Sequence, residues 1–163
     1  MKKVLVIFIM IACVSVFARI GETKEECIKR YGQPTSEVKD SNTVTVVFLK
    51  NDIKIEIIFY QGKAEYIKYR SIRIQESSPL DCTGGTADKT VFTLLNSNYS
   101  GGWIIQNNTS ALVSYTSKNK LLEALYWGSI ENLEIFTVEY KQRDEKEKLE
   151  RAKADEARKL NGF

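Results

Sequence analysis

The feature that most constrains the fold is a short segment near the N-terminus that carries both the start and the stop signals of a helix. Thr23 is a favourable N-cap, and Glu26 three residues later completes a capping box. Gly32 can take the left-handed conformation that ends a helix, and Pro34 prevents its continuation. One apolar stripe of this helix consists of Cys27, Ile28 and Tyr31. We therefore expect the helix to lie on a sheet.

Three segments that follow have the alternating pattern of half-buried strands. In residues 53–60, Ile and Phe occupy every second position, with Lys, Glu and Tyr among the residues between them. Residues 43–49 are rich in β-branched side chains, and residues 64–74 alternate again after a turn that contains Gly62. Residues 35–42 are expected to form a polar connector. Residues 19–75 thus predict one helix over a three-stranded antiparallel meander, with one face of the sheet under the helix and the other wet.

The second half repeats the same order of elements. Residues 76–87 are rich in Ser, Pro and Gly and are expected to be a linker. A second short helix is expected after Asp88, with Val91, Phe92 and Leu95 on one side. Three further strands are expected at residues 111–116, 120–127 and 133–140. Residues 88–140 therefore predict a second helix plus antiparallel sheet.

The C-terminal residues 141–163 are mostly charged or alanine and favour an exposed helix. Residues spaced three or four apart carry opposite charges, as in Asp144 and Lys148, and the apolar stripe is too sparse for a coiled coil. Two alternatives remain open for this tail, a solvated helix or a helix that docks on a partner. The predicted fold class is α+β, with two tandem units of short helix plus antiparallel β-meander and a C-terminal charged helix.

The first eighteen residues have the organisation of a secretory signal peptide. Lys2 and Lys3 precede an apolar stretch at residues 4–12, and Ala18 follows the small-x-small pattern of a cleavage site. We expect cleavage after Ala18 and a periplasmic or secreted protein with no stable membrane span. The alternatives are an uncleaved anchor and lipid attachment at Cys13, the second disfavoured because apolar residues follow that cysteine.

Two cysteines, Cys27 and Cys82, remain after the expected cleavage. In an oxidising compartment, an even count favours one disulfide between them. The alternative is two unpaired thiols, one buried and one in a loop. No metal or redox role is expected, because the chain has no CxxC spacing.

The composition argues against several classes of function. The formal charge of +3 falls to about +1 once Lys2 and Lys3 are removed, which disfavours nucleic-acid binding. The chain contains no histidine, which excludes His-based triads, HExxH metal sites and histidine acid–base chemistry. Gly84, Gly85 and Thr86 lack the remainder of a phosphate loop. We therefore expect no enzymatic activity and no cofactor.

The remaining candidate is the wet face of the first sheet. Its expected members are Tyr60, Tyr66, Lys68 and Arg70, together with Thr45, Val47, Lys54, Glu56 and Ile58. Tyrosine and arginine over aliphatic side chains are typical of protein-binding patches. Two other interpretations remain open: an ordinary half-wet antiparallel face, or a face covered by the second half of the chain. Trp103 and Trp127 are expected to fill the core or its rim.

The residues that delimit the first helix also carry a family resemblance. Gly21-x-Thr23-x-x-Glu26, followed by Tyr31-Gly32-x-Pro34, resembles a signature of small bacterial envelope domains. It is similar to the outer-membrane assembly lipoprotein family SmpA/OmlA (BamE-like), and the helix-plus-meander layout is similar to β-lactamase-inhibitor-like proteins. Bacterial secreted proteins that begin Arg-Ile-Gly-Glu-Thr after the signal peptide are more similar still.

This resemblance implies an envelope protein that acts through contacts and has no catalytic residues. The expected function is a non-catalytic extracytoplasmic protein-binding module of the bacterial envelope, whose partner is another envelope or secreted protein. One alternative is a secreted inhibitor of an extracellular enzyme. A hydrolase is a further alternative, and it would need a concave pocket with convergent polar groups.

Overall fold

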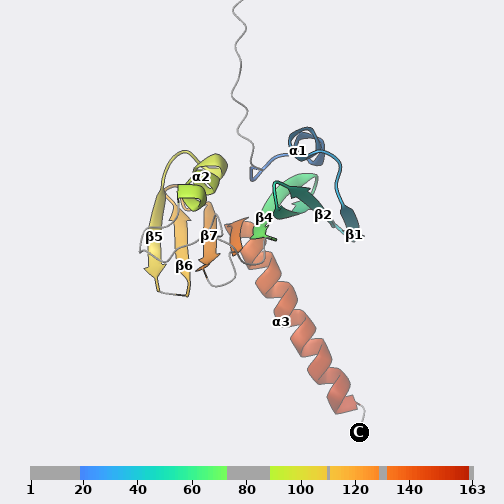
Figure 1. Cartoon of the computed structure of the whole chain (residues 1–163). Coiled ribbons are helices and arrows are strands. Elements are labelled where there is room, and N and C mark those ends of the chain that lie inside the picture. The colour runs from blue at the N-terminus through green and yellow to red at the C-terminus, as the bar shows by residue number, and fades with distance from the viewer. Residues whose placement is uncertain (1–18, 73–88, 110, 129–131, 162–163) are drawn as a thin grey trace, which may run out of the picture.

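The computed structural model describes residues 19–72, 89–109, 111–128 and 132–161. Its centre is one antiparallel eight-stranded sheet with the order β1-β2-β3-β4-β8-β7-β6-β5 (Figure 1). The strands are β1 (Ser36–Asp40), β2 (Thr43–Lys50), β3 (Ile53–Tyr60), β4 (Lys63–Ser71), β5 (Trp103–Asn108), β6 (Val113–Ser117), β7 (Leu122–Trp127) and β8 (Asn132–Thr137). The helices are α1 (Lys24–Tyr31), α2 (Lys89–Asn98) and α3 (Val138–Asn161).

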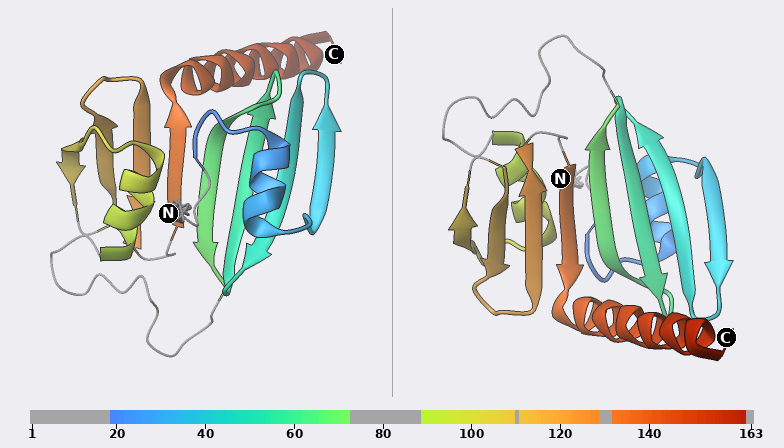
Figure 2. Two further views of the ribbon diagram at one scale, coloured as in Figure 1. Left: turned by 90° about the horizontal axis from the view of Figure 1, so that it is seen from above. Right: turned by 90° about the horizontal axis from the view of Figure 1, so that it is seen from below.

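The sheet has one covered face and one largely open face. Helices α1 and α2 lie on the same side, which we call the inner face (Figure 2, left). Seen from the opposite side, the outer face is crossed by α3 at one end of the strands (Figure 2, right). The buried side chains that form the core therefore come from the inner face of the sheet and from α1 and α2.

The predicted capping of the first helix is confirmed. Glu26 N–H donates to Thr23 Oγ1 at 3.3 Å, and Thr23 N–H donates to Glu26 Oε2 at 2.7 Å. Gly32 has φ of 88° and its N–H donates to the Ile28 carbonyl, which ends the helix. Lys50 Nζ of β2 donates to the Arg30 carbonyl at 2.7 Å. This strand residue therefore provides a hydrogen-bond donor and a positive charge at the C-terminal end of α1.

The prediction of two tandem helix-plus-meander units is wrong. β4 and β8, the last strand of each meander, pair with each other in an antiparallel ladder and form one continuous sheet. Two separate units would leave both strands as edges with unpaired backbone groups. Their pairing also places Ile67 opposite Ile135 and Tyr69 opposite Leu133, and all four side chains are buried. The expected linker at residues 76–87 lies outside the described residues.

Two strands were missed and one boundary was misplaced. Residues 36–40, expected to be a connector, form the edge strand β1, and residues 103–108 form the opposite edge strand β5. The last expected strand was too long, because the chain turns into α3 at Val138. Tyr140 N–H donates to Thr137 Oγ1 at 3.0 Å, so Thr137 ends the strand and begins the helix.

A polar contact between the two halves accompanies the sheet pairing. Ile20 N–H donates to Asn98 Oδ1 at 3.1 Å, which ties the N-terminal segment to the end of α2. Gly21 N–H donates to the Ala64 carbonyl at 2.7 Å, so the same segment also bonds to β4. The segment that precedes α1 thus links β4 in the first half to α2 in the second.

Cys27 belongs to α1, is fully buried, and forms no disulfide with any described residue. Its thiol donates to Glu22 Oε2 at 3.9 Å, and burial raises its pKa to about 12, with the nearby Glu22 carboxylate acting in the same direction. The expected partner, Cys82, lies outside the described residues. The Cys27–Cys82 disulfide therefore stays a prediction.

A substitution in one half tests whether the sheet unfolds as a unit. Ile67→Ala removes a fully buried side chain from β4 and should lower the free energy of unfolding by about 2–5 kcal/mol. Both tryptophans lie in the second half, at β5 and β7, so their fluorescence reports a region distant in sequence. In urea titrations, tryptophan fluorescence and far-UV circular dichroism should shift together.

Leu49→Ala is the matched control, because Leu49 is 52% exposed on the outer face of β2. Its free energy of unfolding should stay within about 0.5 kcal/mol of the wild-type value. A fluorescence transition that keeps its wild-type midpoint in Ile67→Ala would show that the two halves unfold independently.

The state of Cys27 is tested by the pH dependence of stability. Below about pH 9 the thiol is protonated in both states, whereas above it the unfolded chain ionises first, so the free energy of unfolding falls as pH rises towards 12. Cys27→Ala should make this fall less steep by up to about 1.4 kcal/mol per pH unit. Equal slopes for the two proteins between pH 9 and 11 would contradict a free buried thiol and favour the disulfide.

Candidate binding face

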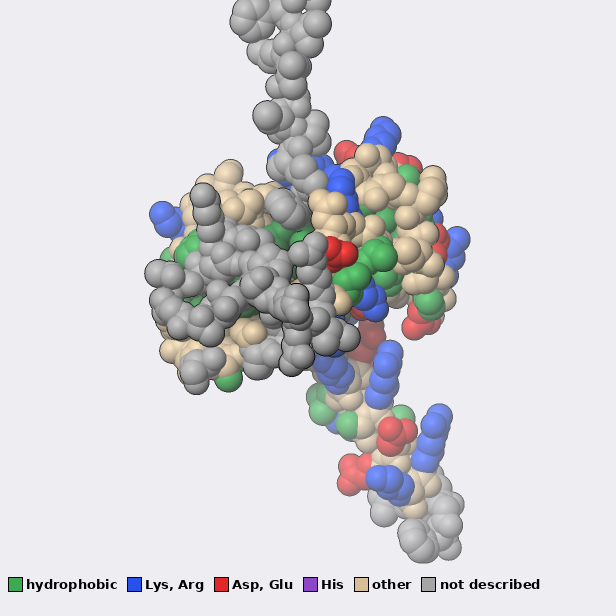
Figure 3. Space-filling view, in the orientation of Figure 1, with side chains coloured by type: hydrophobic (Ala, Val, Ile, Leu, Met, Phe, Trp, Pro, Cys, Tyr) green, Lys and Arg blue, Asp and Glu red, His purple; other side chains and the backbone are tan. Residues whose placement is uncertain are grey.

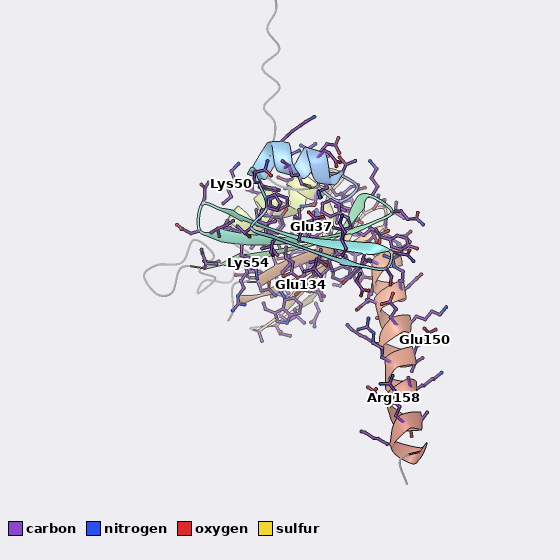
Figure 4. The ribbon with its side chains drawn as sticks, turned by 90° about the vertical axis from the view of Figure 1, so that its right-hand side faces the viewer. Glu37, Lys50, Lys54, Glu134, Glu150 and Arg158 are labelled. Atoms are coloured by element: carbon purple, nitrogen blue, oxygen red, sulfur yellow. The ribbon has the colours of Figure 1, made fainter. Side chains whose placement is uncertain are left out.

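The candidate site is the outer face of the sheet, the side away from α1 and α2. The register of the strands arranges its side chains in rows that run across β2, β3, β4 and β8. One row consists of Thr45, Ile58, Tyr66 and Phe136; the next consists of Val47, Glu56, Lys68 and Glu134; the third consists of Leu49, Lys54, Arg70 and Asn132. Lys54 and Glu134 lie on this side and Lys50 lies on the α1 side (Figure 4).

The four residues predicted for the face lie on the same side of β3 and β4, but they differ in accessibility. Tyr66 is only 8% exposed, and Tyr60 lies under the Arg143 guanidinium. Lys68 is engaged in an ion pair, and Arg70 is exposed. The second half of the chain continues the sheet beside this face and does not cover it; the first turns of α3 cover one end instead.

Aromatic packing fixes the start of α3 to the sheet. The Tyr140 ring lies 5.1 Å from the Tyr66 ring and 6.3 Å from the Phe136 ring, centroid to centroid. Burial raises the pKa of Tyr66, with the Glu134 carboxylate acting in the same direction, and burial raises the pKa of Tyr140 to about 12. Both phenols therefore stay neutral at physiological pH and act as packing groups.

A β-bulge positions the second contact of α3. The register between β3 and β4 shifts after Ile58, so that Glu65 is the extra residue between Ala64 and Tyr66. The Glu65 carboxylate forms an ion pair with Arg143 of α3. The Arg143 guanidinium also lies 3.9 Å from the centre of the Tyr60 ring, a cation–π contact. Arg143 therefore covers the ring of Tyr60, one of the residues expected on the binding face.

In the middle row of the face, the charge of Lys68 is paired with that of Glu134. Lys68 Nζ lies 3.0 Å from Glu134 Oε1, and Glu56 stands opposite Lys68 on the other side. Asn132 Nδ2 donates to the same Glu134 oxygen at 3.1 Å. Because the Lys68–Glu134 pair joins β4 to β8, it supports the junction between the halves and leaves Lys68 less available for a partner.

Three members of the third row form the open part of the face, whereas the fourth, Asn132, is buried. Leu49, Lys54 and Arg70 are exposed, and Lys54 stands directly opposite Arg70 across the β3–β4 ladder. Neither cation forms an ion pair with any described residue. On β7, the row ends at Trp127, the last residue of that strand. Trp127 is half-buried, and it lies on the outer face because the preceding residue, Tyr126, is buried on the inner face. We call Leu49, Lys54, Arg70 and Trp127 the open row.

Sequence reasoning missed the contribution of β7 to this face. The alternation of residues 122–127 buries Leu122, Ala124 and Tyr126 and places the residues between them on the outer face. That pattern is visible in the sequence, and it places Trp127 on the face of the sheet that Tyr126 does not occupy. The join between β7 and the first sheet was not available, because it depends on the long-range pairing of β4 with β8.

A polar cavity of about 360 Å³ lies beside the covered end of the face, between α3 and the turn that joins β1 to β2. Its lining carries both signs of charge, including Asp40, Arg143, Glu147 and Arg151. Within the described ranges, no group of three or more His, Cys, Asp or Glu side chains is placed to hold a metal ion. Side chains of Lys and Arg and of Asp and Glu are distributed along the part of α3 drawn in colour, with some hydrophobic side chains among them (Figure 3).

Among the described helices, none is both long enough and apolar enough to cross a membrane.

Comparison with known proteins gives little similarity. No family model matches the chain, and no curated protein matches it. Among solved structures, it is similar to a cysteine-rich secretory protein from Staphylococcus aureus subsp. aureus Mu50, with 9% sequence identity and a TM-score of 0.43. The match covers 74% of this chain and 45% of that chain, so the chain spans less than half of that protein's length. This similarity is too low to support an argument about function.

The role of Arg143 as the anchor of α3 is tested by its removal. Arg143→Ala eliminates both the Tyr60 contact and the Glu65 ion pair, and should weaken the docking of the first turns of α3 by about 1–2 kcal/mol. Amide hydrogen exchange at residues 138–145 should become faster, because the free energy of local opening falls by the same amount. Lys146→Ala, at an exposed position of the same helix, is the control and should leave these amides unchanged. Unchanged exchange in Arg143→Ala would contradict the anchoring role.

Proposed function

We propose that this chain is a non-catalytic, extracytoplasmic protein-binding module, and that the open row is the centre of its binding surface. The partner we propose is another secreted or envelope protein that presents a carboxylate next to an apolar side chain. The observation that carries the proposal is the juxtaposition of Lys54 and Arg70, two exposed cations directly opposite each other in neighbouring strands.

The charges of the open row favour an acidic group on the partner. Like charges opposite each other across a ladder destabilise the sheet slightly. A partner carboxylate placed between Lys54 and Arg70 relieves this repulsion, and Arg70 can bind it through two parallel hydrogen bonds. The pair therefore has more to gain from a partner than the neighbouring Lys68, which is already matched by Glu134.

The apolar members of the open row supply the second element of a binding surface. Leu49 is more than half exposed, and Trp127 presents an aromatic surface at the other end of the row. Tryptophan and arginine are the residues most enriched among those that dominate binding energies. Half-buried Val47 and Leu125 flank the row and extend the apolar area.

The non-catalytic and extracytoplasmic parts of the proposal are supported by the sequence. The absence of histidine removes the commonest general base and metal ligand. The pattern of residues 1–18 supports export, although these residues lie outside the described part of the chain. The capping signature around Thr23 and Gly32 supports a relationship to small envelope domains such as SmpA/OmlA.

Charge reversal in the open row tests the proposal. The mature chain, residues 19–163, is cross-linked to an envelope extract, and captured proteins are identified by mass spectrometry. Arg70→Glu and Lys54→Glu should each weaken capture of the partner at least about tenfold, because the partner carboxylate then meets a like charge.

Two control proteins locate the binding surface. Lys29→Glu reverses an exposed charge on α1, on the inner side of the molecule, and should capture the partner normally. A chain that ends after Lys148 keeps the anchored part of α3 and removes its distal part. Loss of capture in this shortened chain, with normal capture by Arg70→Glu, would move the binding surface to α3 and contradict the proposal. No enrichment by the wild-type chain would contradict it as well.

A further inference from the structure

The two edges of the sheet differ in how well they are protected against pairing. β5 has a register shift against β6 between Ile105 and Asn107, and such irregularity discourages the addition of a further strand. β1 pairs with β2 in continuous register over its whole length and contains no proline. All five residues of β1 are exposed, and Val38 is 63% exposed. β1 is therefore a regular edge that is available for pairing.

The hairpin geometry shows which backbone groups of β1 are free. Asp40 and Thr43 close the two-residue turn between β1 and β2, and the residues that flank such a turn form a hydrogen-bonded pair. Hydrogen-bonded pairs recur at every second residue, so Val38 is the next residue of β1 that bonds to β2. The N–H and C=O groups of Glu37 and Lys39 therefore point to the free edge.

The sequence of β1 is complementary to itself in antiparallel orientation. In Ser36-Glu37-Val38-Lys39-Asp40, a twofold axis at Val38 brings Glu37 opposite Lys39 of a second copy, and Lys39 opposite Glu37 of that copy. These are the same residues whose backbone groups are free, so each pair can exchange both backbone hydrogen bonds. Opposite charges across a ladder stabilise the pairing. On the outer face, Val38 of one copy lies opposite Val38 of the other.

We propose that two copies of this chain associate through antiparallel pairing of β1 with β1, centred on Val38, to form a symmetric dimer with one continuous sheet. A twofold contact of this kind uses the same patch on both copies. No other described element lies in front of β1 when the edge is viewed directly, and Glu37 lies on this exposed side (Figure 4). α1 lies over the neighbouring strands and not over β1 (Figure 2).

Charge-reversal variants of β1 test both the interface and its register. In Lys39→Glu, two carboxylates face each other across the ladder, and in Glu37→Lys, two ammonium groups do. Each single variant should therefore weaken self-association at least tenfold in sedimentation velocity of the mature chain. An equimolar mixture of the two variants restores opposite charges at both positions and should form a dimer of wild-type stability.

Two further measurements make the outcome decisive. Circular dichroism of each variant establishes that the fold is retained, since Glu37 also pairs with Lys24 of α1 at 2.7 Å. Ile104→Lys places a charge on the other edge, on the exposed surface of β5, and should leave the dimer intact. Three results would overturn the proposal: a wild-type chain that is monomeric up to millimolar concentration, a mixture that fails to associate, or a dimer that is lost in Ile104→Lys and kept in Lys39→Glu.

Discussion

The pairing of β4 with β8 is the interaction on which the rest of the structure depends. It joins two meanders that are separated in sequence, and it turns what would be two exposed edges into the middle of one sheet. The inner side of the ladder is apolar, with Ile67 opposite Ile135, and the outer side carries the Lys68–Glu134 ion pair. Burial favours the contact, and the charges on the outer side fix its register because a shift by one residue would bury them.

This ladder also determines what each face of the molecule can do. Because α1 and α2 both lie on the inner face, the hydrophobic core cluster is built on that side. On the outer face, Tyr66 and Phe136 are buried at the end that α3 covers. The chain leaves β8 directly into α3, so the junction places Tyr140 and Arg143 against Tyr66 and Tyr60 at one end of the face. The opposite end keeps its exposed cations, and we propose that it is the part that meets a partner.

Local chemistry explains which elements were predictable from the sequence. The first helix was predictable because Thr23, Glu26 and Gly32 fix its ends through contacts within the segment. β2 and β3 were predictable because one of their faces is buried, which produces alternation. β1 has no buried residue, so its sequence carries no alternating signal and was taken for a connector. The strand state of such a segment depends on its pairing with β2.

The candidate face was less predictable than the strands that form it. The alternation of β4 placed Tyr66, Lys68 and Arg70 on one side correctly, yet the contacts of each depend on distant residues. Tyr66 is covered by Tyr140 of α3, and Lys68 is paired with Glu134 of β8. The β-bulge at Glu65 is likewise visible only once the register of β4 against β3 is known.

The pairing of β4 with β8 is tested most directly by nuclear magnetic resonance of isotopically labelled residues 19–163, which detects contacts between the two strands. Cross-strand nuclear Overhauser effects are expected between backbone protons of Ile67 and Ile135 and between those of Tyr69 and Leu133, together with slow exchange of the amides in this ladder. Fast amide exchange in both strands without any such cross-strand effect would show two separate sheets and would contradict the pairing.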